Sequence, residues 1–226
     1  MKIRSAYELE SKFDEDLSWR KKEFTTLKLM VNSSREHESK ILIKAAIALF
    51  YSHWEGHIKH CALVYLSYLN HLAPSYQKLT DNFVQMSLHA KFKEGFSIRK
   101  FPSQQAIFNY ITNIPNEKFS LDENTVIDTE SNLKYDVILN ILNQLGLNNS
   151  TFELKENFIN SKLVKCRNAI AHGDKLSNEE LEETYREIED ELLNMIVIFQ
   201  NLIRNAVISN RHSAPNSGIN CLVEAT

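Results

Sequence analysis

Large apolar side chains recur at helical spacing near the start of the chain. Over residues 5–31 the repeat consists of Leu9, Phe13, Leu17, Phe24, Leu27 and Val31. This spacing is close to the 3.6-residue period of an α-helix with one buried face. We therefore predict a long amphipathic helix over 5–31, ended by the polar stretch Asn32-Ser33-Ser34.

A second, longer helix is predicted from about residue 35 to 72. Its apolar face comprises Ile43, Ile47, Phe50, Trp54, Ile58, Cys61, Tyr65 and Leu69. Ser33 and Glu36 have the spacing of a capping box, which predicts the start of this helix, and Pro74 predicts its end. Two long helices with a short polar connection are typical of an antiparallel helical hairpin.

Residues 74–155 are less regular, with short apolar pieces separated by Gly95, Pro102 and Pro115. We interpret them as short helices and loops inserted between two helical hairpins. A last helix is predicted to start at Ser177, where Glu180 completes a second capping-box spacing, and to run to about residue 208. The prediction is an all-α fold: one helical domain over 1–208, with a flexible tail over 209–226.

Composition supports this picture and narrows the function. The chain has 226 residues, with 43% hydrophobic and 24% charged residues, only 5 Gly and 4 Pro, and a net charge of −3. A polycation that binds nucleic acid over its whole surface is excluded, so any RNA contact must be a local patch. We predict a cytoplasmic protein without membrane contact, for three reasons. The spacing of Cys61, Cys166 and Cys221 shows no disulfide pattern. The chain starts without a leader-like segment, and no apolar stretch is judged long enough to span a bilayer.

The chemistry that the sequence offers is concentrated in Arg167-Asn168-Ala169-Ile170-Ala171-His172, followed by Gly173. A histidine transfers protons near neutral pH, and an arginine presents a planar fork of donors that fits a phosphate. On a helix the apolar Ile159, Leu163, Cys166 and Ile170 form one stripe, and the polar motif residues point elsewhere. Spacing alone is equally compatible with an ordinary helix end that carries a surface Arg and His.

The motif Arg167-Asn168-x3-His172 resembles the R-x4-6-H signature of the HEPN superfamily, most closely its bacterial toxin-type, MAE-like ribonucleases. The segment Trp54-Glu55 on the early long helix and the late position of the motif helix agree with this resemblance, which covers roughly residues 1–208. It implies a HEPN-like bundle and a metal-independent endoribonuclease, usually a homodimer with facing motif helices. It also implies catalytic roles for Arg167, Asn168 and His172.

Two further residues have supporting roles by the same resemblance, Glu55 and Trp54. Glu55 is expected to orient a motif side chain, but pairing with Lys59 one helical turn later is an equally good interpretation. His53, His57 and His60 could share one helical face as metal ligands. Trp54 stands where a zincin motif needs Glu, however, so we predict no metal and no cofactor.

Basic residues that could hold RNA are Lys165 on the motif helix and Lys91, Lys93, Arg99 and Lys100, which alternate with phenylalanines. Cations hold phosphates and aromatic rings stack on bases. The alternative is a connector with solvated lysines. We expect this segment to fold toward the entrance of the groove that the facing motif helices of the homodimer line.

The leading functional hypothesis is RNA cleavage that leaves 2′,3′-cyclic phosphate and 5′-hydroxyl ends. The resemblance further implies a toxin or antiphage effector restrained by a partner protein such as an antitoxin. HEPN toxins controlled by nucleotidyltransferases carry a Tyr two residues after the motif His, but Asp174 occupies that position here. The alternative function is a non-catalytic module that binds nucleotides or proteins.

Overall fold

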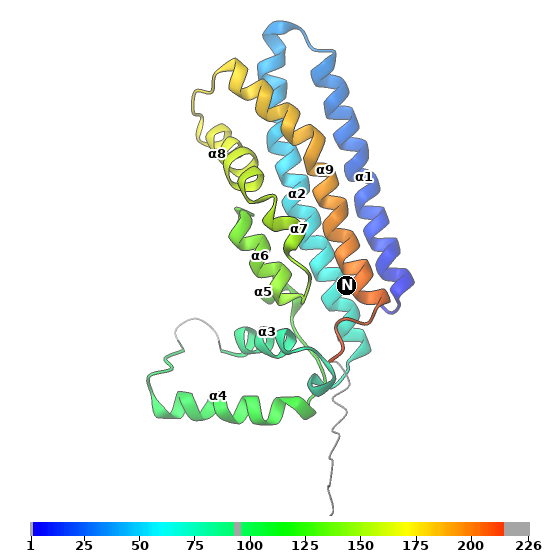
Figure 1. Cartoon of the computed structure of the whole chain (residues 1–226), viewed down its shortest axis with the longest axis vertical. Coiled ribbons are helices and arrows are strands. Elements are labelled where there is room, and N and C mark those ends of the chain that lie inside the picture. Colours follow the sequence, from blue (N-terminus) through cyan, green and yellow to red (C-terminus); the bar gives the residue numbers. More distant parts are fainter. Residues whose placement is uncertain (1, 93–95, 215–226) are drawn as a thin grey trace, which may run out of the picture.

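Three long helices form the body of the molecule: α1 (Ala6–Asn32), α2 (Glu36–Leu72) and α9 (Asn178–Ile208). The computed structural model describes residues 2–92 and 96–214, and it contains no β-strand within them. Figure 1 shows α1, α2 and α9 running side by side along the long axis. The predicted all-α bundle and the antiparallel α1–α2 hairpin are confirmed.

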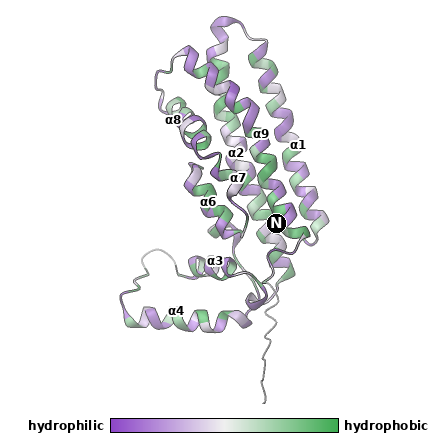
Figure 2. Ribbon diagram, in the orientation of Figure 1, coloured by the Kyte–Doolittle hydropathy of each residue, from purple (hydrophilic) through white to green (hydrophobic). Residues whose placement is uncertain are grey.

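The core lies around α2, because α2 contacts α1, α9 and α8. Phe50, Trp54, Ile58 and Tyr65 of this helix are all fully buried. Phe24 of α1 stacks on Phe50 with ring centroids 4.2 Å apart. Burial of each large apolar side chain contributes about 1.5–3 kcal/mol, so the helical repeat in the sequence specifies the core directly. In Figure 2 the long helices carry both hydrophobic and hydrophilic residues along their length, as helices with one buried face do.

The connection between α1 and α2 differs from its prediction. Ser33 does not cap α2; its hydroxyl donates instead to the carbonyl of Leu29 at 2.8 Å and so closes the end of α1. The residue before α2 is Arg35, whose backbone N–H donates to the carboxylate of Glu38 at 3.2 Å. The prediction of a Ser33–Glu36 capping box was therefore wrong, because the Ser33 hydroxyl hydrogen-bonds to a carbonyl in the last turn of α1.

The middle of the chain consists of short helices and loops. These are η1 (Tyr76–Lys78), α3 (Asp81–Lys91), α4 (Phe101–Asn113), η2 (Ile114–Asn116), α5 (Glu123–Val126), α6 (Tyr135–Gln144) and α7 (Ser150–Glu153). We call residues 81–113 the arm, because α3 and α4 project sideways from one end of the bundle (Figure 1). None of the α4 residues is buried.

The motif helix begins as a π-helix. Phe158–Val164 form the π-helical η3, which continues into α8 (Lys165–His172). The predicted apolar stripe is present, because Ile159, Leu163 and Cys166 are buried. A π-helix bonds i to i+5 and is wider than an α-helix, so the segment is not the single α-helix assumed from the spacing. Segments of this kind often occur at functional sites.

The last helix is capped as predicted: the Ser177 hydroxyl accepts the N–H of Glu180 at 3.2 Å. The helix α9 is long and apolar enough to cross a membrane, judged by length and composition alone. The prediction that no segment is long enough to span a bilayer is therefore wrong for α9. Core helices meet the same test, and 44% of that α9 window is buried.

The beginning of the predicted flexible tail is packed rather than free. His212 is buried, its carbonyl accepts the N–H of Thr80 at 3.0 Å, and Ser213 forms an isolated bridge with Leu79. The prediction is wrong for these residues because the backbone directly after η1 offers them partners. Residues 215–226 lie outside the described residues.

Candidate functional site

Arg167 is held in a fixed position between α8 and α2. Its guanidinium lies over the ring of Tyr51, with Cζ 3.9 Å from the ring centroid. Nη1 donates to Asn168 Oδ1 and Nη2 to the carbonyl of Ser131, each at 2.9 Å. Nη2 also lies 4.0 Å from Glu55 Oε2. Stacking plus two in-plane hydrogen bonds fixes both the position and the plane of the fork.

Glu55 is kept at a distance from the guanidinium. Its Oε1 accepts the hydroxyl proton of the buried Thr129 at 2.6 Å, and its other oxygen approaches Arg167 only to 4.0 Å. The carboxylate therefore aligns Arg167 without forming a close bidentate pair. Thr129 belongs to the loop 127–134, in which Glu130 and Ser131 both have a positive φ, 53° and 52°. Two consecutive non-glycine residues in this region carry backbone strain, which concentrates at functional sites.

Tyr51 and Trp54 anchor the same loop from α2. The Tyr51 hydroxyl accepts the N–H of Leu133 at 2.6 Å, and the Trp54 indole N–H donates to the Leu133 carbonyl at 3.4 Å. Burial, together with the charge of Glu55, raises the pKa of Tyr51 to about 12, so its hydroxyl stays protonated. Trp54 is fully buried, and its hydrogen bond to Leu133 connects it to the loop of the site.

His172 stands at the end of α8 and is exposed. The helix ends there because Gly173 adopts a left-handed conformation, with φ 78°. The N–H of Gly173 bonds to Ile170 and that of Asp174 to Ala169, which is the Schellman pattern. Five residues of α-helix place His172 about 140° around the axis and about 7.5 Å along it from Arg167.

The structure thus brings together only part of the predicted set. Arg167, Asn168 and Glu55 converge, whereas His172 and the exposed Lys165 point to other sides of α8. For Glu55 the geometry favours the predicted orienting role over the pairing with Lys59. Sequence reasoning missed three residues of the site: Tyr51, Thr129 and Ser131. Tyr51 lies one helical turn before Glu55 and could have been found on that basis, but the loop residues carry no sequence signal.

The described residues of the predicted basic segment do not lie next to Arg167 in the structure. Lys91 ends α3, Arg99 and Lys100 directly precede α4, and all three are exposed. Lys93 lies outside the described residues. Figure 1 shows the end of α3 and the start of α4, where these residues lie, well separated from α8. The expectation that this segment folds toward the motif is therefore not met within one chain.

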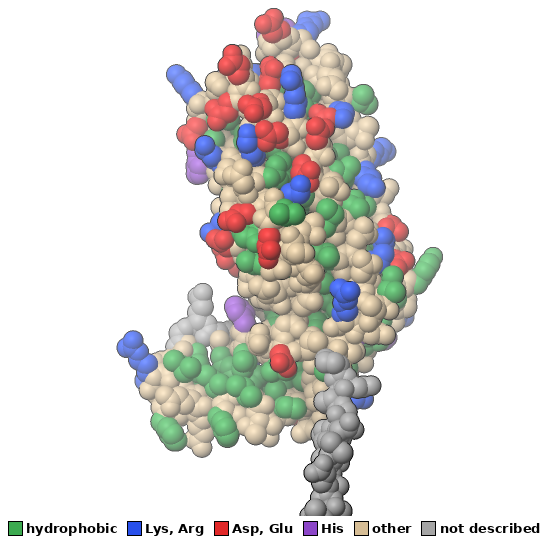
Figure 3. Space-filling view, in the orientation of Figure 1, with side chains coloured by type: hydrophobic (Ala, Val, Ile, Leu, Met, Phe, Trp, Pro, Cys, Tyr) green, Lys and Arg blue, Asp and Glu red, His purple; other side chains and the backbone are tan. Residues whose placement is uncertain are grey.

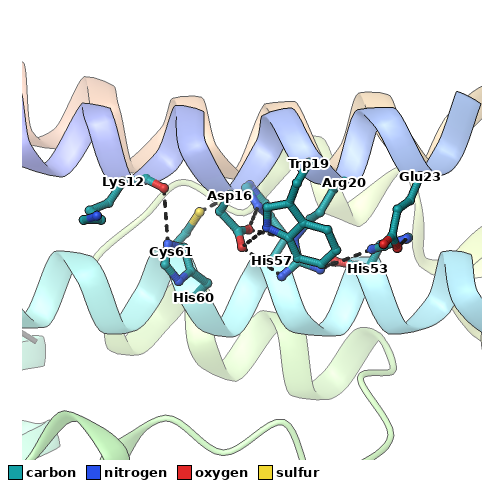
Figure 4. A network of polar contacts seen from close by, with 9 residues as sticks. All are labelled: Lys12, Asp16, Trp19, Arg20, Glu23, His53, His57, His60 and Cys61. Atoms are coloured by element: carbon teal, nitrogen blue, oxygen red, sulfur yellow. Dashed lines mark hydrogen bonds and ion pairs between the residues drawn. The ribbon is translucent and has the colours of Figure 1, made fainter.

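The histidines of α2 belong to a buried network with α1 instead of a metal site (Figure 4). Asp16 accepts hydrogen bonds from Arg20 at 2.7 and 3.1 Å and from His57 Nδ1 at 2.6 Å. The other ring nitrogen of His57 lies 3.3 Å from Cys61 Sγ. Arg20 also donates to the carbonyl of His53 at 3.2 Å. Among residues 2–92 and 96–214 no group of three or more His, Cys, Asp or Glu side chains could hold a metal ion.

Burial and pairing set the protonation of this network. Burial alone would raise the pKa of Asp16, but the hydrogen bonds from His57 and Arg20 outweigh it and hold that pKa well below its usual range. Burial lowers the pKa of His57 and of His53, and it raises the pKa of the Cys61 thiol. Asp16 is therefore an anion between the Arg20 cation and a neutral His57, an arrangement that joins α1 to α2.

Comparison with known proteins bears on the whole bundle. A family model described as RiboL-PSP-HEPN matches residues 15–207, from within α1 to the end of α9. The match confirms the HEPN resemblance under this description, which differs from the MAE-like one. Searches of curated proteins and of solved structures gave no significant match.

Proposed function

The chain belongs to the RiboL-PSP-HEPN family, and from this membership and the site geometry we propose that it is a metal-independent endoribonuclease. The observation that carries the proposal is the restrained guanidinium of Arg167, stacked on Tyr51 and held by Asn168 and Ser131. A donor fork fixed before the substrate arrives stabilises developing charge without reorganisation during the reaction.

Arg167 retains donors for a phosphate. A guanidinium has five N–H groups, and the contacts to Asn168 and Ser131 use one on each terminal nitrogen. The second N–H of each terminal nitrogen is left, and Nε is buried without a hydrogen-bond partner. The ion pair with Glu55 is long, at 4.0 Å, so Glu55 does not take up these N–H groups by close hydrogen bonds.

His172 supplies proton transfer in the proposed reaction. It takes the proton of the ribose 2′-hydroxyl, the 2′-oxygen forms a bond to phosphorus, and the bond from phosphorus to the 5′-oxygen breaks. A second acid, either water or His172 of another copy of the chain, protonates the leaving 5′-oxygen. The products carry 2′,3′-cyclic phosphate and 5′-hydroxyl ends.

We further propose that the active form is a homodimer in which two α8 helices face one groove. The angular separation of Arg167 and His172 on one helix makes it difficult for a single copy to hold the phosphate and supply both acid and base. Ala169 and Ala171 leave little bulk on the helix between them, which permits close approach. Mixing Arg167→Ala with His172→Ala protein should then restore part of the activity, because the groove of a mixed dimer contains one Arg167 and one His172, and water serves as the second acid.

Cleavage of total RNA in EDTA tests the function. Wild-type protein should cut, and Arg167→Ala and His172→Ala should each reduce the rate at least about 100-fold, the scale of one acid–base group. His71→Ala is the matched control, because His71 is exposed near the C-terminal end of α2, whereas Tyr51 and Glu55 of the site lie in the middle of that helix. Equal melting temperatures establish that the variants fold, and unchanged cleavage by His172→Ala would refute the assignment.

A non-catalytic binding module is the second candidate. It is favoured by the net charge of −3 and by the acidic first turns of α9, where Glu179 and Glu180 lie; Figure 3 shows acidic side chains gathered around that end of the bundle. Control by a partner protein, in a toxin or antiphage role, is part of the proposal on family grounds. Binding of RNA without any cleavage in the EDTA assay would favour the module.

A further inference from the structure

A cavity of about 570 Å³ opens between the arm and the bundle. It lies between the end of α3, α5, the loop 127–134 and α6, and Figure 3 shows the surface indented there. The lining side chains that offer polar or aromatic contacts are His89, Phe92, Asp128, Glu130, Asn140 and Gln144. A volume of this size holds a planar heterocycle with its sugar.

The walls combine an aromatic ring with hydrogen-bond acceptors. Phe92 is supported edge-on by Tyr110, with ring centroids 5.5 Å apart. Asp128 Oδ1 accepts the N–H of Glu130 at 2.8 Å, which holds the backbone of Glu130 in its left-handed conformation and presents its exposed side chain at the cavity. The exposed side chains of Glu130 and Asn140 both carry acceptor oxygens. The cavity therefore offers acceptors to a ligand that brings N–H donors.

The cavity is directly connected to Arg167. Glu130 lines it, and the next residue, Ser131, accepts a hydrogen bond from the Arg167 guanidinium at 2.9 Å. Two consecutive residues of the loop 127–134 therefore contact the cavity and the Arg167 guanidinium.

We propose that this cavity binds a guanine base next to the scissile phosphate, with Glu130 as the specificity-determining residue. Guanine alone among the four bases presents two adjacent donors, N1–H and the 2-amino group, that match both oxygens of a carboxylate. Unstacked RNA bases are read along this Watson–Crick edge and stack on aromatic rings. This inference rests on the proposed ribonuclease function and adds the preferred substrate: single-stranded RNA with guanine at the cut.

Nucleotide binding tests the cavity without requiring catalysis. In His172→Ala protein, titration calorimetry should show GMP binding at least about tenfold tighter than AMP, which lacks both donors. IMP, which lacks only the 2-amino group, should bind between them. Glu130→Gln should remove the preference for GMP, whereas Asp136→Asn, an exposed carboxylate at the start of α6, should leave it unchanged.

Mapping of cleavage ends separates the two proposals. Wild-type protein should cut next to guanine, and Glu130→Gln should cut with little base preference. Cleavage without base preference in the wild type, or equal binding of GMP and AMP, refutes the proposed guanine site. Neither result contradicts the proposed ribonuclease function. Selective GMP binding without RNA cleavage supports the cavity and refutes the ribonuclease.

Discussion

Removal of the Asp16 carboxylate should destabilise the fold far more than removal of a surface carboxylate. Arg20, only 6% exposed, depends on Asp16 for its charge partner at 2.7 and 3.1 Å. Arginine does not lose its proton in proteins, so Asp16→Leu leaves an unpaired cation in the core. Breaking a buried pair in this way costs about 3–5 kcal/mol.

The expected loss of stability corresponds to a decrease in melting temperature. For a domain of this size each kcal/mol corresponds to about 2–4 °C, so Asp16→Leu should lower the melting temperature by about 6–20 °C. Asp14→Leu on the same helix is the control, since its side chain is 66% exposed and its contact with Arg204 lies at the surface. An exposed pair contributes about 0–1 kcal/mol.

A double variant distinguishes the unpaired charge from lost packing. Asp16→Leu with Arg20→Met replaces both charges by apolar groups of similar volume and should recover much of the lost stability. Thermal unfolding followed by circular dichroism measures all four proteins. Equal melting temperatures for Asp16→Leu and Asp14→Leu, or no recovery in the double variant, would refute the argument that an unpaired Arg20 is the cause.

Three other outcomes are expected. Gly173→Ala should lower stability by about 1–2 kcal/mol, because alanine is disfavoured at the φ of 78° although space is free there; an unchanged melting temperature contradicts this. Thr129→Val removes the hydrogen bond that restrains Glu55 and should slow RNA cleavage while folding is kept; an unaltered rate would count against the positioning role of Thr129. Stability should be full above pH 6.5 and fall as pH decreases, since burial lowers the folded-state pKa of His57 and His53 and the unfolded chain takes up their protons first. Melting curves at pH 7.5 and 5.5 that coincide would exclude this linkage.

The amino-acid sequence by itself determined the helical architecture and indicated a candidate location for the chemistry. The helices α1, α2 and α9 follow from repeats within single segments, because amphipathic periodicity decides locally which face is buried. The same holds for the end of α8, where Gly173 terminates the helix just after His172. Arg167 and His172 were singled out as candidates because their residue types suit phosphate binding and proton transfer and their spacing resembles the HEPN motif.

Only the tertiary structure decided what surrounds Arg167. Its partners Ser131 and Glu55 are 36 and 112 positions away in the sequence, and contacts of that separation depend on how α2, α8 and the loop 127–134 pack. Helical spacing likewise could not show that η3 is a π-helix, that Ser33 closes α1 in place of capping α2, or that the basic residues of the arm lie away from the motif. The physical reason is the same in each case: periodicity reports which face of a segment is buried, and long-range packing selects which group it meets.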